Sequence, residues 1–250
     1  MTDFHRNIFY YYSGFQQPDQ DRERQLENNT TKSLINTLEF CNPKVSIKFL
    51  AWLGITTKEP AKFELQKVTI GEGKIRTRSQ LLLLGLVPHK EDSVLCFELK
   101  GPVAGVSCPD AWIYGDDYVV LLESKVSGSL EANQMQCHYQ KLKVDTKKNP
   151  RYEVRTWAEV HQFFAGILPE LSGKDEWIVK QFTKYMEWNS MTEFIGVEQG
   201  IFDYFVTHDD EDSRRWVRDV IRCIPLQKKS KPACKPSIHS TRITTWARFA

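Results

Sequence analysis

The segment PDAWIYGDDYVVLLESKV carries the residues best suited to chemistry. Asp110 precedes one apolar run, and Glu123 and Lys125 close the next one. Side chains two positions apart on a strand point to the same face, so we expect Glu123 and Lys125 to point the same way. With a turn at residues 115–117, the two strands form a hairpin and bring Asp110 to the level of Glu123. The spacing therefore predicts three charged groups at one end of a β-hairpin.

Two neighbouring carboxylates are costly to bury unless something neutralises them, and a divalent cation is a natural partner. Oxygen ligands suit Mg²⁺ or Mn²⁺, and we expect the backbone carbonyl of Ser124, between Glu123 and Lys125, to join Asp110 and Glu123 as a ligand. Such an ion polarises a phosphoryl oxygen, and the lysine would orient a water or stabilise charge on the phosphate. These groups suit phosphodiester hydrolysis. The alternative is an ordinary ion pair between Glu123 and Lys125 at a strand end.

A proline-led aspartate, an unbroken apolar strand, a tight turn and an ExK sequence resemble the PD-(D/E)xK, or restriction-endonuclease-like, nuclease superfamily. The resemblance covers roughly residues 26–160. It implies an α/β restriction-endonuclease-like core, with a mixed central sheet flanked by helices. It also implies that Asp110 and Glu123 bind the metal and that Lys125 is catalytic. Glu27 matches an acidic residue that many members use as an additional ligand or ligand orienter, although glutamate is also favoured at a helix start by the helix dipole.

The sequence NQMQCHYQKL after the ExK segment predicts a helix with Gln134 and His138 on one face, because the two residues are four positions apart. It resembles the glutamine-containing helix that follows the ExK strand in several of these nucleases. We therefore expect Gln134 to assist catalysis and His138 to contact nucleic acid. The alternative is a helix whose polar side chains face solvent. Tyr139 lies five residues after Gln134, which differs from the QxxxY spacing of the exonuclease-type branch.

A run of basic residues follows this helix and predicts a phosphate-binding rim, although a solvated surface is the usual meaning of such runs. The net charge of +2 is too small to indicate a nucleic-acid partner, so the local distribution of charge carries the argument. We expect Lys141, Lys147 and Lys148 to contact DNA. The whole run comprises Lys141, Lys143, Lys147, Lys148, Arg151 and Arg155.

The surrounding segments predict the elements that position these residues. Residues 26–40 have a helical stripe of apolar side chains that includes the face of Glu27, and Pro43 ends that helix. A further helix is expected from Leu130 to about Val144, capped by Ser127 or Ser129. The runs expected to be strand-like are 45–53, 63–70, 94–100 and 151–155, whereas 81–84 fits either a strand or a buried helix. Thr156 and Glu159 form a capping box that begins another helix.

The length of 250 residues allows one large domain with an extension. We expect an N-terminal arm at residues 1–25 and the nuclease core at 26–172. A helical C-terminal extension would follow at 173–225, and a basic, proline-rich tail at 226–250.

Composition excludes several classes of protein. The chain is 41% hydrophobic and 26% charged, as expected of a globular protein. Its apolar runs are too short to span a bilayer and its first residues lack a signal-peptide core, so we expect a cytoplasmic protein without a membrane partner. The six cysteines form no CxxC pair, and we expect four of them to be buried free thiols because their neighbours are apolar or strand-like: Cys41, Cys96, Cys108 and Cys137. Cys223, Cys234 and His239 are too loosely spaced to favour zinc.

The sequence therefore predicts a Mg²⁺- or Mn²⁺-dependent deoxyribonuclease, with cleavage inside the chain rather than from an end. By resemblance alone, small nucleases of this kind serve bacterial anti-phage or restriction-type defence. Besides DNA, the expected partners are a second copy of the chain, or a protein supplying the ATPase or target recognition that this sequence lacks. An RNA nuclease is one alternative. A non-catalytic nucleic-acid-binding or assembly module on a nuclease fold is another.

Overall fold

The computed structural model describes residues 7–9, 19–90, 107–143 and 149–192, together with positions 207 and 214. The chain divides into two units, Met1–Glu193 and Phe194–Ala250. The fold described below is that of the first unit. The expected strand at 94–100, the zinc candidates and the basic tail lie outside the described residues.

The first unit is an α/β structure built on a five-stranded mixed sheet of strand order β1-β3-β4-β2-β5. Strand β3 pairs antiparallel with β1 and with β4, and β2 pairs parallel with β4 and with β5. β4 therefore lies in the middle of the sheet. The strands are β1 Lys62–Leu65, β2 Gln80–Val87, β3 Ala111–Tyr114, β4 Tyr118–Ser124 and β5 Arg151–Thr156.

The β3–β4 hairpin has the predicted turn and register. Ala111 lies opposite Leu122 and Tyr114 opposite Val119, so the next residue pair beyond the strand end is Asp110 and Glu123. Gly115 is required at the turn because a Cβ there would lie 2.5 Å from the ring of Tyr118. All of β4 is buried, which explains its nearly continuous apolar sequence.

The leucine run of residues 81–84 is part of β2, which decides between the strand and the helix that the sequence allowed. β2 has a parallel neighbour on each side and a covered face above and below. Leu82 and Leu84 face one core, and Leu81 and Leu83 face the other. A strand buried on both faces needs apolar side chains at every position, so its sequence has no period of two.

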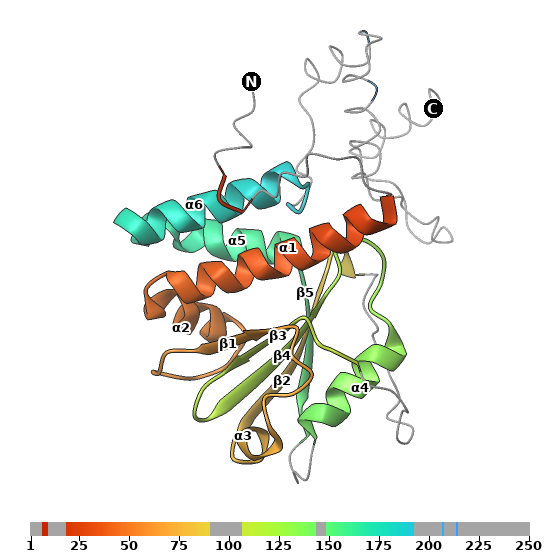
Figure 1. Cartoon of the computed structure of the whole chain (residues 1–250). Coiled ribbons are helices and arrows are strands. Elements are labelled where there is room, and N and C mark those ends of the chain that lie inside the picture. Colours follow the sequence, from red (N-terminus) through yellow and green to blue (C-terminus); the bar gives the residue numbers. More distant parts are fainter. Residues whose placement is uncertain are drawn as a thin grey trace, which may run out of the picture. The chain divides into compact units, whose positions relative to one another are not determined.

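Helices cover the two faces of the sheet unequally (Figure 1). Helices α1, α2, α5 and α6 form a layer over one face, while α4 and the short α3 pack on the other. The helices are α1 Asp19–Phe40, α2 Pro43–Trp52, α3 Glu72–Arg76, α4 Ala132–Leu142, α5 Trp157–Ile167 and α6 Gly173–Trp188, with a 3₁₀ turn η3 at Leu168–Glu170.

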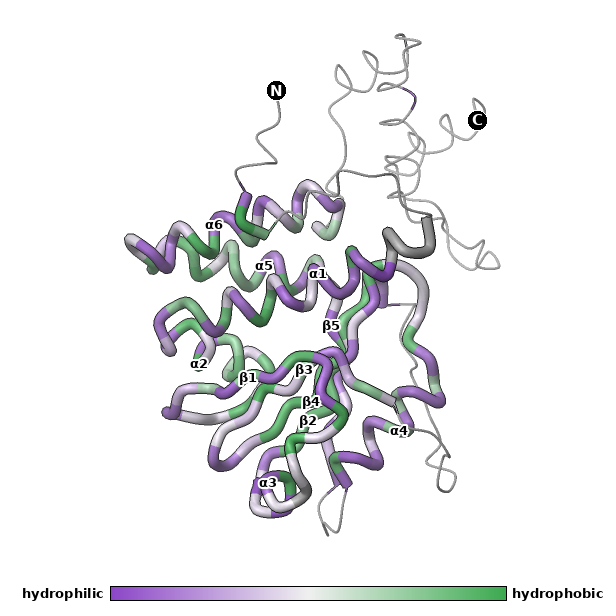
Figure 2. Tube along the Cα trace, viewed as in Figure 1, coloured by the Kyte–Doolittle hydropathy of each residue, from purple (hydrophilic) through white to green (hydrophobic). Residues whose placement is uncertain are grey.

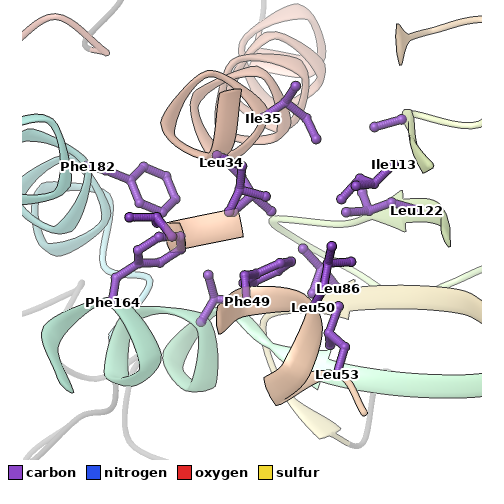
Figure 3. Close-up of a cluster of buried hydrophobic side chains, with 14 of the residues drawn as sticks. Leu34, Ile35, Phe49, Leu50, Leu53, Leu86, Ile113, Leu122, Phe164 and Phe182 are labelled. Atoms are coloured by element: carbon purple, nitrogen blue, oxygen red, sulfur yellow. The ribbon is translucent and has the colours of Figure 1, made fainter. Parts of the chain in front are cut away.

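The larger core lies between the four-helix layer and the sheet. Figure 3 shows Leu34 of α1 and Phe49 of α2 among side chains from α5, α6 and the strands. Phe164 stacks on Phe49 at 6.0 Å and meets Phe182 edge-on at 5.2 Å between ring centroids. In Figure 2 the apolar colour is concentrated on the central strands, whereas α4 is mainly hydrophilic. Close packing of this core fixes α1 against the sheet.

The prediction of a strand at Val45–Leu53 was wrong, because this segment is helix α2. Pro43 lies in the first turn, where its missing N–H is not needed, and the Asn42 side chain accepts a hydrogen bond from the backbone N–H of Lys44 at 3.0 Å. Buried Val45 and Phe49 are four residues apart, which is helical spacing. Pro43 therefore both follows one helix and begins the next.

Other boundaries also differ from the predictions. Helix α1 begins at Asp19, inside the expected N-terminal arm. Strand β1 spans Lys62–Leu65, so only residues 63–65 of the expected run 63–70 are paired in the sheet. Helix α4 begins at Ala132 after an N-cap at Glu131 that makes no side-chain capping bond, so neither expected serine occupies the N-cap. By contrast, the capping box of Thr156 and Glu159 is present at α5.

Helix α6 belongs to the first unit and not to a separate extension starting at residue 173. The hydroxyls of Tyr185 and Thr30 lie 2.9 Å apart, and the side chain of Asn29 donates a hydrogen bond to the same tyrosine oxygen at 3.1 Å. Phe182 is fully buried against the core. The domain boundary therefore falls after α6, because α1 needs α6 to cover its outer side.

Within the described residues, no helix has the length and apolar character needed to cross a membrane.

The N-caps of α5 and α6 give a matched test of helix capping. The Thr156 hydroxyl accepts a hydrogen bond from the Glu159 N–H at 3.1 Å, whereas Ser172 at the start of α6 makes no such bond. We expect Thr156→Ala to lower the free energy of unfolding by about 1 kcal/mol and Ser172→Ala to lower it by clearly less. Urea unfolding of both variants measures the difference. Equal losses would contradict the proposed strength of the α5 cap.

Candidate active site

Glu123, at the end of β4, is the most deeply buried carboxylate of the site, with 1% of its surface exposed. Its side chain points toward α4. Oε1 accepts a hydrogen bond from Gln134 Nε2 at 2.5 Å, and Oε2 lies 2.9 Å from His138 Nε2. The two residues are four positions apart on α4, so one helical face holds both oxygens of the carboxylate.

His138 is completely buried beneath this carboxylate. Burial and the neighbouring Lys141 lower its pKa to about 4, so the imidazole is neutral at pH 7. Among the described residues Nδ1 has no hydrogen-bond partner. The tautomer that fits these contacts carries its proton on Nε2 and donates it to Glu123. The hydroxyl oxygen of Ser107 lies 3.5 Å from the same nitrogen. His138 was expected to contact nucleic acid, but here its side chain has no exposed surface and instead supports Glu123.

Lys125 connects the sheet end to the helix layer. Its backbone is fixed by its N–H, which donates to Leu86 O at 2.8 Å, and by its carbonyl, which accepts from Trp157 Nε1 at 2.9 Å. Its Nζ lies 2.8 Å from Glu27 Oε1 and 3.6 Å from Glu123 Oε1. Burial alone lowers the pKa of Lys125, but its hydrogen bond to Glu27 and the surrounding carboxylates outweigh burial and raise it. The lysine therefore remains charged between two carboxylates.

Glu27 reaches the site from α1, on the face that the apolar stripe predicted. Its carboxylate accepts a hydrogen bond from Lys125 Nζ at 2.8 Å and another from the backbone of Val126, and burial raises its pKa despite these contacts. Glu27 was expected to be a metal ligand. In this arrangement one of its oxygens is engaged by the lysine, so its direct action is to hold Lys125 at the sheet end.

Asp110 lies beside Glu123, as the hairpin register requires. Its Oδ2 accepts two hydrogen bonds from Ser124, one from the backbone N–H at 2.8 Å and one from the hydroxyl at 2.9 Å. Burial and the charge of Glu123 raise the pKa of Asp110 to about 6. Burial likewise raises the pKa of Glu123 to about 7, even though Lys125 opposes that shift.

The charges of the site favour a cation. Glu27, Asp110 and Glu123 gather around Lys125, and the histidine beside them is neutral at pH 7. Carboxylate oxygens are the donors that Mg²⁺ and Mn²⁺ prefer, and each ionised oxygen has more than one lone pair. The donor chemistry therefore fits such an ion. In the part of the chain that the structure describes, however, no three acidic, histidine or cysteine side chains already form a ligand group.

Two residues of the site escaped the sequence analysis. Thr31, one helical turn after Glu27, lies with its hydroxyl 2.6 Å from the Ser124 hydroxyl. Ser107 precedes the hairpin and meets His138. The spacing of Thr31 from Glu27 is a signal that could have identified it, since residues four apart share a helix face. No pattern in the sequence identifies Ser107.

The basic run is less available to phosphate than its sequence suggests. Lys141 Nζ donates to the carbonyls of Ser107 and Val68, and burial lowers its pKa. On β5, Arg151 and Arg155 both contact Glu153, at 3.5 and 2.5 Å. Lys143 is exposed after α4, and the expected contacts Lys147 and Lys148 lie outside the described residues.

Comparison with protein-family models, with curated proteins and with solved structures finds no match to this chain. The chemical interpretation of the site therefore rests on its own residues and geometry.

The raised pKa values predict that Glu123→Gln stabilises the metal-free protein at alkaline pH. When the pKa of an acid is higher in the folded state than in the unfolded state, ionisation of that acid destabilises the fold. The contribution of Glu123 to the free energy of unfolding should therefore fall as pH rises from about 4.5 to about 7. We expect the variant to be more stable than wild type at pH 8 by on the order of 1–3 kcal/mol, and to lose this advantage near pH 4.5. Urea unfolding across this range measures it.

The stability of the variant is compared with that of wild type at each pH, because His138 is present in both proteins and titrates in the opposite sense over the same pH range. Its lowered pKa makes it destabilise the fold as pH falls. Glu131→Gln, which changes an exposed glutamate at the start of α4, is the matched control and should follow the wild-type profile. A Glu123→Gln protein less stable than wild type at pH 8 would show that the ionised carboxylate stabilises the fold.

Proposed function

We propose that this chain is a metal-dependent nuclease of the PD-(D/E)xK type, with a restriction-endonuclease-like core, that hydrolyses DNA phosphodiester bonds. The observation that carries the proposal is the gathering of Asp110, Glu123 and Lys125 at the end of one β-hairpin. A buried carboxylate and a half-buried one, both with raised pKa values and both beside a charged lysine, are costly to maintain unless they serve a ligand.

Asp110 and Glu123 would hold Mg²⁺ or Mn²⁺, with the Ser124 carbonyl as a further ligand. When bound, such an ion polarises the phosphate and lowers the pKa of a water. The two hydrogen bonds that Asp110 accepts from Ser124 both go to Oδ2, so Oδ1 would be the oxygen that contacts the ion. Lys125, held near Glu123 by Glu27, would donate to the attacking water or to charge developing on the phosphate.

Gln134 and His138 would act through Glu123. Gln134 donates to Oε1 and His138 to Oε2, so the carboxylate has little rotational freedom. Gln134 would therefore assist catalysis by orienting the Glu123 carboxylate. Fixing a ligand in this way lowers the cost of ordering it when substrate and ion arrive.

The proposed substrate is DNA, cut within the chain, in bacterial anti-phage or restriction-type defence. A second copy of the chain, or a partner that selects the target or hydrolyses ATP, would complete such a system. The choice of DNA as substrate and the role in defence both come from the family resemblance. RNA is therefore tested beside DNA in the cleavage assay.

Removing any one of the three charged groups should abolish cleavage. We expect Asp110→Ala, Glu123→Ala and Lys125→Ala each to reduce the cleavage of supercoiled plasmid at least ~100-fold with Mg²⁺ or Mn²⁺, because each removes a ligand or a transition-state contact. Glu131→Ala is the matched control on an exposed carboxylate and should cleave like wild type.

The same assay with linear DNA, single-stranded RNA and EDTA tests the remaining elements of the proposal. Loss of cleavage with EDTA supports metal dependence. Cleavage of RNA alone would replace DNA by RNA as substrate, and full cleavage by Glu123→Ala would exclude this active site. Binding of nucleic acid without cleavage by wild type would leave a non-catalytic module.

The basic rim can be tested independently of cleavage in an Asp110→Ala background. We expect replacement of Lys147 and Lys148 by alanine to weaken DNA binding for all sequences and to flatten the slope of log affinity against log salt by about one unit per lost phosphate contact. Salt titration of binding measures the slope. The double variant Lys174→Ala and Lys180→Ala on α6 removes the same charge, and an equal effect there would show a non-specific response to net charge.

A further inference from the structure

Two buried hydroxyls, those of Thr31 and Ser124, form a hydrogen-bonded path from α1 to Asp110. Thr31 is 2% exposed and Ser124 is fully buried. Their hydroxyl oxygens lie 2.6 Å apart, and Ser124 Oγ lies 2.9 Å from Asp110 Oδ2. This hydrogen-bonded path therefore links a helix on one face of the sheet to a carboxylate at the end of the sheet.

The direction of these hydrogen bonds follows from the number of protons. An ionised carboxylate only accepts, so the Ser124 hydroxyl donates its single proton to Asp110. The lone pairs of Ser124 Oγ are then left to accept from Thr31. Thr31 therefore donates across to the strand at 2.6 Å, and its contact with the carbonyl of Glu27 on its own helix is longer, at 3.2 Å.

Neighbouring hydroxyls on α1 behave differently. Thr37 donates to the carbonyl of Ser33 at 2.8 Å, and Ser33 donates to that of Asn29 at 2.7 Å. Such bonds to the carbonyl four residues earlier are the usual way in which a helix satisfies a buried hydroxyl. Thr31 has a closer partner in the neighbouring strand. Its position is also one turn from Glu27, which holds Lys125.

We propose that Thr31 is a positioning residue that acts through Ser124 to fix the Asp110 carboxylate for cation binding. This inference rests on the proposed function, in which Asp110 is a ligand. The alternation of β4 makes the arrangement possible, because Glu123 faces α4 and Ser124 faces α1. Helix α1 thus orients two groups of the site, the lysine through Glu27 and the aspartate through Thr31.

The test compares Thr31→Val with Thr31→Ser and Thr37→Val. Valine keeps the shape of threonine and removes the hydroxyl, and serine restores it. We expect Thr31→Val to weaken Mn²⁺ binding ~10-fold and to slow plasmid cleavage, because losing a residue that orients a ligand typically has an effect of this size. Thr31→Ser should bind Mn²⁺ nearly as wild type does. Thr37→Val also deletes a buried α1 hydroxyl, and should leave Mn²⁺ binding unchanged.

A double-mutant cycle identifies the route. If Thr31 acts through the Ser124 side chain, Thr31→Val should weaken Mn²⁺ binding no further in a Ser124→Ala background. Additive losses, or unchanged Mn²⁺ binding in Thr31→Val alone, would overturn the inference. Mn²⁺ titration by electron paramagnetic resonance measures all these affinities.

A metal-free measurement separates this inference from the proposed function. The Ser124 N–H donates to Asp110 at 2.8 Å, so release of the carboxylate should speed exchange of that amide in Thr31→Val relative to Thr37→Val. Faster exchange in a protein that binds no Mn²⁺ would preserve the positioning of Asp110 and reject both the ligand role and the proposed function. Equal exchange in the two variants would reject the positioning itself.

Discussion

The cost of burying the Glu123 carboxylate at the end of an apolar strand shapes the surroundings of this site. A buried carboxylate must find hydrogen-bond donors or positive charge, or else take up a proton. Here α4 supplies Gln134 and His138, and the chain itself supplies Lys125 two residues later. These donors reduce the penalty without removing it, since the pKa of Glu123 remains raised to about 7. The fold therefore holds negative charge that a cation would stabilise.

Strand β4 distributes that requirement over two helical layers. Because successive side chains alternate, Glu123 faces α4 while Ser124 faces α1. Asp110, across the hairpin, is bound by both the N–H and the hydroxyl of Ser124. Each layer thus reaches one carboxylate, and Lys125 joins α1 to β4. A shift of α1 against the sheet would disturb the aspartate and the lysine together, which links the packing of the large core to the geometry of the site.

Stability and proposed activity make opposite demands on these residues. Replacing a buried carboxylate by a neutral side chain relieves desolvation in the metal-free protein, yet it removes the ligand on which cleavage would depend. Such conflicts are common at functional sites, where residues are retained despite their cost to the fold. The neutral, buried His138 fits the same interpretation. It supports Glu123 without adding a charge that would compete with a cation.

The sequence by itself determined the features that depend on neighbouring residues. The turn after Tyr114, the register that brings Asp110 to Glu123, and the capping box of Thr156 all follow from local spacing and turn chemistry. Asp110, Glu123 and Lys125 could be proposed as one site for the same reason, since all three lie at the end of one hairpin. The segment 45–53 was misassigned because its apolar residues fit two periods, and only its packing beneath α5 selects the helix.

Tertiary structure decided which way the polar side chains point. A helix face holding Gln134 and His138 could turn toward DNA or toward the sheet, and contact with the buried Glu123 selects the sheet. Lys141 likewise binds backbone carbonyls instead of presenting a free charge. Thr31 was not identified from the sequence because threonine is common inside helices. Its role depends on the Ser124 hydroxyl, which lies within hydrogen-bond distance only in the folded protein. Such contacts join residues far apart in the chain, and a single sequence specifies them only through the complete packing of the core.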